Sequence, residues 1–274
     1  MQQVTKNVFV ETAWPGANAS YIVTTQGLIL VDTPYYPSYA NQWKNTVEKN
    51  GTVVYLINTE PHDDHYASNF LFNVPVIAHK IARDAMVAAD VNQIAAVISQ
   101  NDPASASLLK DLRINTPAIT FTDQMNLYSG NHSFQLFFTP GHSAGQITIL
   151  VPEERVVFTG DNVCNRIQGF FHEADPYAWL KSLKRIGELD FDYIVPGHGL
   201  PCKKDYLREE TEFVQSCIDK TIEAIHNGWS KEETISRVSF ERYPLDLGLE
   251  EYGKVLLQKS VQNMYEFLSQ KQSS

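Results

Sequence analysis

The chain has 274 residues, a length that suits one large layered α/β domain. Hydrophobic residues make up 43% of it and aromatic residues 11%, which is enough for a sizeable core and excludes a disordered chain. Its formal net charge of −10 argues against a nucleic-acid partner, because affinity for phosphate backbones comes from lysine and arginine.

The N-terminal part predicts strands with one helix between them. Residues 7–13 and 20–34 are rich in Val, Ile and Tyr, and the turn sequence TTQG folds the second range into a hairpin. Residues 37–51 predict a helix, because proline stands at its start and glycine at its end. Residues 52–58 and 74–80 predict two further buried strands.

The middle of the chain changes character twice. Residues 81–100 carry apolar side chains at helical spacing and predict a helix. Residues 101–116 are weakly patterned, which we interpret as a mobile insertion over a site. Strands return over residues 118–163, with Gly-Asn at 130–131 and Pro-Glu-Glu at 152–154 as hairpin connections.

The last third predicts mainly helix. Residues 175–189 begin with Asp-Pro, a typical cap and first-turn pair, and residues 191–199 predict a last strand ending at a histidine. From about residue 205 the chain is helical, with Ser230 as a further helix cap. The repeated order of strands and then helix favours two packed sheets with helices outside, in a single domain over residues 1–274.

The C-terminal helix carries a stripe of apolar residues, which are Val255, Leu256, Val261, Met264, Tyr265 and Leu268. Packing of this stripe on the chain's own core is the default expectation, and a homodimer interface is the alternative.

The cysteines and the N-terminus bear on the compartment. Cys164, Cys202 and Cys217 have no CxxC spacing, and their odd number does not suggest a disulfide framework. No signal peptide is predicted in MQQVTKNVFVETAWPG, and no apolar run approaches the roughly 20 residues of a membrane span. We therefore expect a cytoplasmic protein without a membrane partner. A chain whose signal peptide had been removed would look the same and would be periplasmic or secreted.

Four apolar strands each end in potential metal ligands, in VVYLINTEPHDDH, FQLFFTPGH, RVVFTGD and FDYIVPGH. The side chains at these ends are Glu60, His62, Asp64, His65, His142, Asp161 and His198. A single histidine after a glycine would be weak evidence for a metal site. Strand ends at one rim of a sheet can converge in space, so four such motifs together indicate a metal centre. Imidazole and carboxylate ligands suit Zn²⁺, and also Mn²⁺ or Fe²⁺.

These motifs resemble the metallo-β-lactamase superfamily, whose signature is His-x-His-x-Asp-His, a distant Gly-His, a Gly-Asp and a final Gly-His. The matches are EPHDDH at 60–65, TPGH ending at His142, TGD ending at Asp161 and PGHG around His198. The resemblance covers roughly Val8 to Cys202. It implies an α/β fold, the four-layer αββα sandwich of two mixed β-sheets flanked by helices, with the metals at one edge of the sheets.

The resemblance also implies a dinuclear centre, with two Zn²⁺ ions as the expected cofactors. The first ion would be held by the residue at position 60, His62 and His142. The second ion would be held by Asp64, His65 and His198. Asp161 would bridge the two ions, and Asp64 would also act in catalysis by orienting the nucleophile or moving a proton.

Glu60 departs from the pattern, because most of the family has histidine there and a minority has glutamate. Carboxylate oxygen is an acceptable zinc ligand. Two divalent ions, three carboxylates and one hydroxide sum to zero, so we expect bound water to be acidified less than with histidine. Oxygen ligation also tilts the preference slightly toward Mn²⁺ or Fe²⁺. The alternative is that Glu60 turns away and the first site is weak or empty.

Other residues are candidates for supporting or substrate-binding roles. Asp32 is the best candidate to accept the free N–H of a ligand histidine, although it would also suit a turn; Thr59 and Ser143 are the others. Asp63 is expected to face solvent. The resemblance implies that residues 165–177 line the substrate pocket, with Phe170, Phe171, His172 and Tyr177 shaping an apolar cleft and Arg166 holding an anion. Tyr35 and Tyr36, which follow Asp32 and Pro34, form another candidate rim of the pocket. For His172, an exposed loop position without a role is the interpretation that surface frequencies favour.

We therefore expect a hydrolase of a small-molecule ester, lactone, thioester or amide, with metal-bound hydroxide as the nucleophile. The alternatives are an iron-dependent redox member of the superfamily and a β-lactamase with glutamate in its first metal site. A nuclease is disfavoured by the acidic charge. A non-enzymatic member has only Glu60 in its favour, because the six other ligands are intact.

Overall fold

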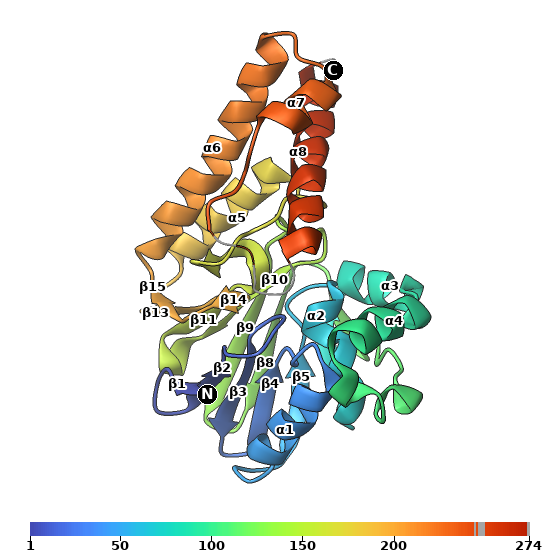
Figure 1. Cartoon of the computed structure of the whole chain (residues 1–274). Coiled ribbons are helices and arrows are strands. Elements are labelled where there is room, and N and C mark those ends of the chain that lie inside the picture. Colours follow the sequence, from blue (N-terminus) through green and yellow to red (C-terminus); the bar gives the residue numbers. More distant parts are fainter. Residues whose placement is uncertain (244, 246–249, 273–274) are drawn as a thin grey trace.

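The computed structural model describes residues 1–243, 245 and 250–272, and two mixed sheets form its centre (Figure 1). In spatial order, the first sheet contains β1 (Gln2–Gln3), β2 (Val8–Glu11), β3 (Ala19–Thr24), β4 (Gly27–Val31), β5 (Val53–Ile57), β6 (Val76–His79) and β7 (Ile119–Phe121). The second contains β15 (Cys202–Lys203), β13 (Tyr193–Val195), β11 (Val156–Phe158), β10 (Ile147–Val151), β9 (His132–Phe138) and β8 (Gln124–Ser129). β12 (Cys164–Asn165) and β14 (His198–Gly199) form a short parallel pair.

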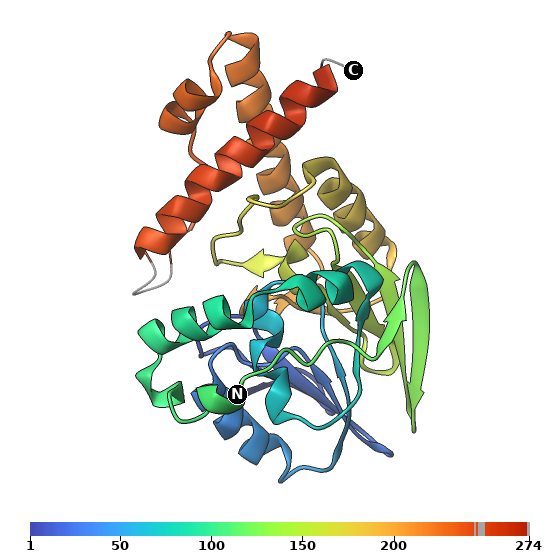
Figure 2. The ribbon, with the colours of Figure 1, turned by 90° about the vertical axis from the view of Figure 1, so that its right-hand side faces the viewer.

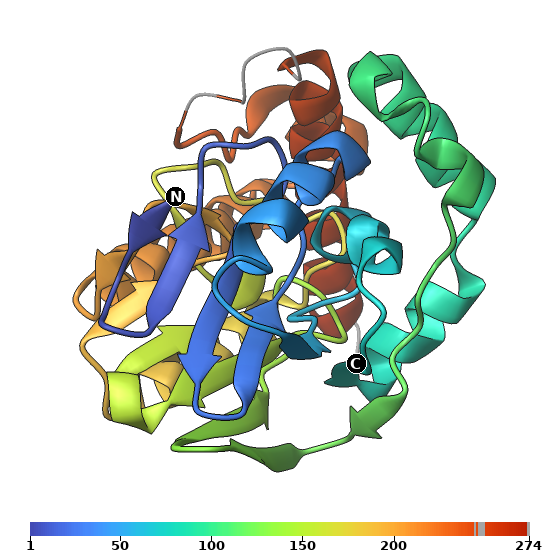
Figure 3. The ribbon, with the colours of Figure 1, turned by 90° about the horizontal axis from the view of Figure 1, so that it is seen from below.

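Helices flank the two sheets. They are α1 (Pro37–Val47), α2 (Asp63–Tyr66), α3 (Lys80–Ala88), α4 (Val91–Asn101), α5 (Pro176–Glu188), α6 (Tyr206–His226), α7 (Lys231–Arg237) and α8 (Glu250–Gln272). The helices α6, α7 and α8 gather at one end of the molecule (Figure 2). Seen from below, the blue strands of the first sheet lie beside the yellow-green strands of the second (Figure 3). The predicted αββα sandwich is confirmed.

Apolar side chains fill the space between the two sheets. Ile29 and Ile57 of the first sheet belong to one buried cluster with Phe134 and Ile149 of the second. Full burial of each such side chain contributes about 1.5–3 kcal/mol to folding. A second cluster joins the outer face of the second sheet to α5, α6 and α8, and a third joins α1 to the outer face of the first sheet. Each sheet is therefore held on both faces.

Parallel strands bring the predicted ligand segments to one rim. β4, β5, β6 and β7 are mutually parallel neighbours, so their carboxyl ends lie along the same edge of the first sheet. β11 and β13 are parallel in the second sheet and also end at ligand segments. The rim is thus the place where loops from both sheets meet.

The structure of the middle of the chain adds detail to two predictions. Residues 81–100 form two helices instead of one, because Asp90 accepts hydrogen bonds from the backbone of the next helix and starts it anew. Residues 101–116, predicted as a mobile insertion, form short 3₁₀ turns tied to α1, where Ser38 donates to Asp102 at 2.6 Å.

The C-terminal helical part agrees with its prediction. Ser230 caps α7 through a capping box with Glu233. The predicted stripe on α8 packs on the chain's own core through Val261, Met264 and Leu268, and Leu256 is also buried, whereas Val255 is exposed. Gly248 and Leu249, the first residues predicted for this segment, lie outside the described residues. Within the ranges that are described, no helix is both long and apolar enough to cross a membrane.

Candidate metal centre

The seven predicted ligand side chains converge at the rim. Six of them form two groups of three, and within each group the three ligand atoms lie within 4.8 Å of one another. We call Glu60, His62 and His142 the first pocket, and Asp64, His65 and His198 the second pocket. A further group of Glu60, His65 and Asp161 joins the two pockets.

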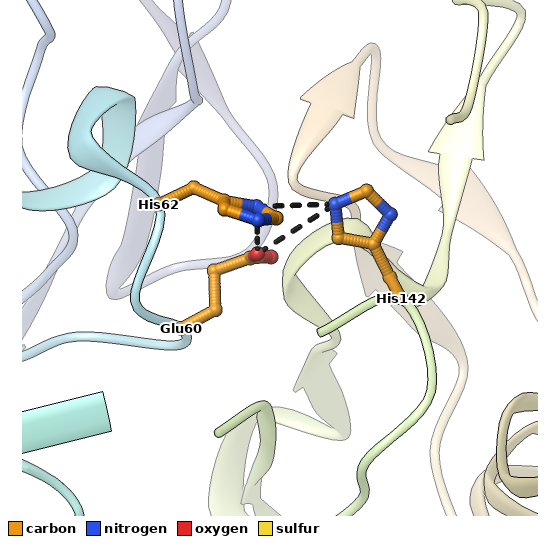
Figure 4. Close-up of side chains that lie close together, drawn as sticks. All are labelled: Glu60, His62 and His142. Atoms are coloured by element: carbon orange, nitrogen blue, oxygen red, sulfur yellow. Dashed lines mark hydrogen bonds and ion pairs between the residues drawn. The ribbon is translucent and has the colours of Figure 1, made fainter. Parts of the chain in front are cut away.

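In the first pocket, Glu60 points at the two histidines (Figure 4). Its Oε2 lies 2.7 Å from Nδ1 of His62 and 3.7 Å from Nε2 of His142, and these two ring nitrogens are 3.2 Å apart. The glutamate is 0% exposed, so it does not turn away into solvent. Its other oxygen accepts a hydrogen bond from the backbone N–H of Asp161 at 3.0 Å, which fixes the carboxylate plane.

In the second pocket, Nε2 of His198 lies 3.3 Å from a carboxylate oxygen of Asp64 and 3.3 Å from one of Asp161. Asp161 also lies 3.3 Å from Nε2 of His65 and 3.6 Å from Nε2 of His142. This carboxylate therefore faces histidines of both pockets, as a bridging ligand would.

Tight backbone turns at glycine residues orient two of these side chains. A Cβ atom on Gly197 would lie 1.8 Å from Oδ1 of Asp161 and 2.7 Å from the backbone carbon of Gly160. Gly160 itself has φ of 49°, in the left-handed region that favours glycine. The glycines before Asp161 and His198 thus allow the two ligand loops to pack against each other.

Asp32 lies behind His65 and is 2% exposed. It accepts hydrogen bonds from the backbone N–H of Thr59 at 2.8 Å and from the Thr59 hydroxyl at 2.6 Å. Its Oδ2 is 2.9 Å from Nδ1 of His65, which leaves Nε2 of that ring to face the centre. Ser143, another predicted partner, has a buried hydroxyl without a hydrogen bond among the described residues.

Carboxylates and imidazoles in the centre shift each other's pKa values. Burial alone would raise the pKa of the acids, but nearby histidines outweigh it, so the pKa of Asp64 falls to about 2 and that of Asp161 lies well below its usual value. Burial opposes protonation of His65 and His198, yet the surrounding carboxylates hold both pKa values well above the usual range. The side chains thus form a compact cluster of carboxylates and protonated histidines. A divalent cation that bound there would displace the protons of the histidines.

The residues present fit such a cation. Oε2 of Glu60, Nε2 of His65 and Oδ1 of Asp161 are buried, and they face other side chains of the same cluster: Nδ1 of His62 lies 2.7 Å from Oε2 of Glu60, and Nε2 of His65 lies 3.3 Å from Oδ1 of Asp161. A bound cation would replace these contacts between candidate ligands with metal–ligand bonds. The donor set of imidazole nitrogen and carboxylate oxygen suits Zn²⁺, Mn²⁺ or Fe²⁺.

His172 lies against the first pocket instead of standing free on a loop. Its ring stacks on that of His62 with centroids 5.4 Å apart, and it lies 6.1 Å from the ring of His142. Burial and the two neighbouring histidines lower the pKa of His172 to about 4. Sequence reasoning missed the next residue, Glu173, whose Oε2 lies 3.4 Å from Nε2 of His62. This contact lowers the pKa of Glu173 to about 2.

Two predicted substrate contacts are wrong. Phe171 is 0% exposed and packs against Trp179 in the core at a ring distance of 4.8 Å, because the chain turns inward at this position. Tyr36 is 4% exposed, as the residue preceding α1, and packs beside Tyr35 and Tyr39. Neither side chain offers a surface to a substrate.

The other predicted contacts have mixed outcomes. Phe170 is partly buried, with its ring 6.4 Å from that of His172. Arg166 is exposed and forms no ion pair with a ligand carboxylate in the described part of the chain, so its role stays a prediction. Asp63 does not simply face solvent: it accepts a hydrogen bond from Tyr35 at 3.2 Å, and burial together with Asp64 raises its pKa.

Asn162 is a second residue that the sequence reasoning missed. Its side-chain oxygen accepts from the backbone N–H of His142 at 3.1 Å, and its amide donates to Thr139 at 2.7 Å. Trp179 donates to the backbone oxygen of Asn162 at 3.0 Å. The asparagine thereby fixes the turn that carries His142. Its place directly after Asp161 is the only signal the sequence offers.

Comparisons with known proteins agree with this geometry. Residues 13–198 match the profile of the metallo-beta-lactamase superfamily. A hydroxyacylglutathione hydrolase of Chelativorans sp. is 29% identical over 121 residues, covering 44% of this chain and 45% of that protein. The metallo-beta-lactamase type 2 of Elizabethkingia meningoseptica is 24% identical over 204 residues, covering 71% and 73%. The chain spans about half the length of the first curated relatives it matches.

Solved structures of low sequence identity share the fold. A metallo-beta-lactamase from Pontibacter korlensis has a TM-score of 0.63 at 17% identity, covering 78% of this chain and 97% of its own. The inverting sec-alkylsulfatase Pisa1 from Pseudomonas sp. has a TM-score of 0.72 at 16% identity, covering 96% and 49%. From the profile match over most of its length, together with the converging ligands, the chain belongs to the metallo-beta-lactamase superfamily.

Proposed function

We propose that this protein is a metal-dependent hydrolase, with two Zn²⁺ ions, that cleaves an ester, lactone, thioester or amide bond of a small molecule. The observation that carries the proposal is the convergence of seven ligand side chains in two pockets joined by Asp161. A family profile alone would not carry it, because one fold hosts many functions.

When bound, the ions would acidify a water molecule and polarise the substrate's oxygen. Glu60, His62 and His142 would hold the first ion, and Asp64, His65 and His198 the second. Among the ligand carboxylates, the side chain of Asp64 is 24% exposed, against 10% for Asp161 and 0% for Glu60. Asp64 is therefore the carboxylate best placed to meet an arriving substrate and to move a proton.

Glu60 gives the centre its own electrostatic character. Two divalent ions and three carboxylates sum to +1, whereas a histidine at position 60 would leave +2. A less positive centre releases an anionic product more readily and favours harder cations somewhat more. We therefore expect activity with Mn²⁺ as well as Zn²⁺.

The names of the relatives support hydrolysis without choosing a substrate. One is called a hydroxyacylglutathione hydrolase and another a metallo-beta-lactamase. A solved neighbour is called a sec-alkylsulfatase. A panel of chromogenic esters, thioesters, lactones, β-lactams and a secondary alkyl sulfate covers these bond types. We expect a small-molecule substrate and no nucleic-acid partner.

The test combines metal analysis with this panel. Activity should vanish on exhaustive chelation and return on addition of Zn²⁺ or Mn²⁺. Turnover that persists unchanged after chelation would remove the proposed mechanism. Purified protein that contains iron and absorbs visible light would instead favour a redox member of the superfamily.

A further inference from the structure

The two pockets are supported unequally by the residues behind them. We propose that the second pocket retains its cation, while the first pocket is the labile one and depends on Glu173 for its affinity. This inference rests on the metal centre of the proposed function and deepens it. Glu173 acts here as a positioning residue for His62.

A buried carboxylate supports a ligand histidine of the second pocket. Asp32 faces Nδ1 of His65 at 2.9 Å and is itself held by the backbone and hydroxyl of Thr59. A carboxylate behind a ligating histidine fixes the ring's orientation and makes the ligand more basic. Because Asp32 is 2% exposed, water and salt screen this contact little.

The first pocket has weaker support. Nε2 of His62 faces Glu173 at 3.4 Å, and the side chain of this glutamate is 63% exposed. Nδ1 of His142 is buried without a partner among the described residues. His172 stacks on His62, but its buried Nδ1 has no described hydrogen-bond partner either, so it restrains the ring without orienting it electrostatically. Asn162 holds the backbone of His142, and among the described residues the carboxylate that faces the outer nitrogen of a ligand imidazole in this pocket is the exposed one of Glu173.

A competing arrangement uses the same residues differently. His62, His172 and Glu173 also form a group whose ligand atoms lie within 4.8 Å of one another. An additional cation held there would make Glu173 a ligand of a third ion. The number of ions bound per chain separates the two arrangements.

The experiment is a titration of metal-free protein with Co²⁺ against a competing chromophoric chelator, followed by its visible spectrum. The wild type should bind two ions with unequal affinity. His142→Ala should abolish the weaker class of binding site, and His198→Ala should abolish the tighter class. These two variants assign the weaker class to the first pocket and the tighter class to the second. Glu173→Gln should weaken the weaker class roughly tenfold, alter its Co²⁺ spectrum and leave the tighter class unchanged.

Two further variants control the comparison. Asp32→Asn should weaken the tighter class alone, and asparagine tolerates the left-handed φ of 54° at this position. Glu188→Gln, at an exposed glutamate at the far end of α5, should change neither class. Urea unfolding of each variant checks that the fold is intact.

Three results would overturn the inference. The first is that the wild type binds its two ions with equal affinity. The second is that Glu173→Gln weakens both sites equally or neither site, and the third is that the wild type binds three ions per chain and this variant two. Unequal classes without turnover on the substrate panel would leave the inference standing and remove the proposed hydrolase. Two sites of equal affinity together with metal-dependent turnover would support the proposed hydrolase and remove the inference.

Discussion

Glu210 offers a quantitative test of the packing between α6 and the ligand loops. It is 1% exposed, and Oε2 has no hydrogen-bond partner among the described residues. Arg242 approaches this oxygen only to 3.8 Å and also faces Glu209 at 3.5 Å. Burial, partly offset by Arg242, raises the pKa of Glu210 to about 8.

The sign and size of the effect follow from linkage. The folded protein binds this proton more tightly than the unfolded chain, whose carboxyl has the ordinary pKa of 4.5. The contribution to stability is complete below about pH 4.5 and is lost as the pH rises to about 8. At about 1.4 kcal/mol per pH unit over this window, the loss approaches about 5 kcal/mol.

Glu210→Gln removes the charge and keeps the shape. The variant should gain stability over the wild type by up to about 1.4 kcal/mol for each pH unit between pH 5 and 8, and the gain should level off above that. Urea unfolding at each pH, with chelator present for both proteins, measures the difference. Glu212→Gln, at a side chain that is 70% exposed, is the control and should show no such trend. A difference for Glu210→Gln that stays flat across this range would refute the reasoning.

Three further predictions concern the centre and its surroundings. Gly197→Ala should lose at least one bound ion on metal analysis, because the new Cβ would lie 1.8 Å from Oδ1 of Asp161, whereas Gly187→Ala, whose nearest neighbour is 3.8 Å away, should keep both. Glu60→Ala should lose the ion of the first pocket and most activity, and unchanged metal content would show that Glu60 is no ligand. Phe171→Ala should lower the free energy of unfolding by about 3–5 kcal/mol, as expected for a core residue, and a loss below about 1 kcal/mol would restore it as a surface contact.

The ligand side chains could be predicted because each stands directly after an apolar strand, where local sequence fixes both the strand and its end. Asp32 follows the same logic, since it comes directly after β4, and the neighbouring strand β5 leads into the loop that carries Glu60. Glu173 could not be found this way: it reaches His62 from a loop 111 positions later, and only the packing of the two halves brings them together.

The substrate-facing residues show the limit of reasoning from neighbours in sequence. Phe170, Phe171 and His172 are consecutive, yet one is partly buried at the rim, one lies in the core and one stacks on His62. Their directions depend on how the loop meets α5 and α8, where Asn263 of α8 donates to the backbone oxygen of Phe171. Periodicity carries no information in such an irregular segment.

The most direct measurement is anomalous X-ray scattering from crystals of the metal-loaded protein, recorded at the zinc absorption edge. Two peaks are expected, one among Glu60, His62 and His142 and the other among Asp64, His65 and His198, with Asp161 between them. Crystals that contain zinc but show no peak at either position would contradict the account.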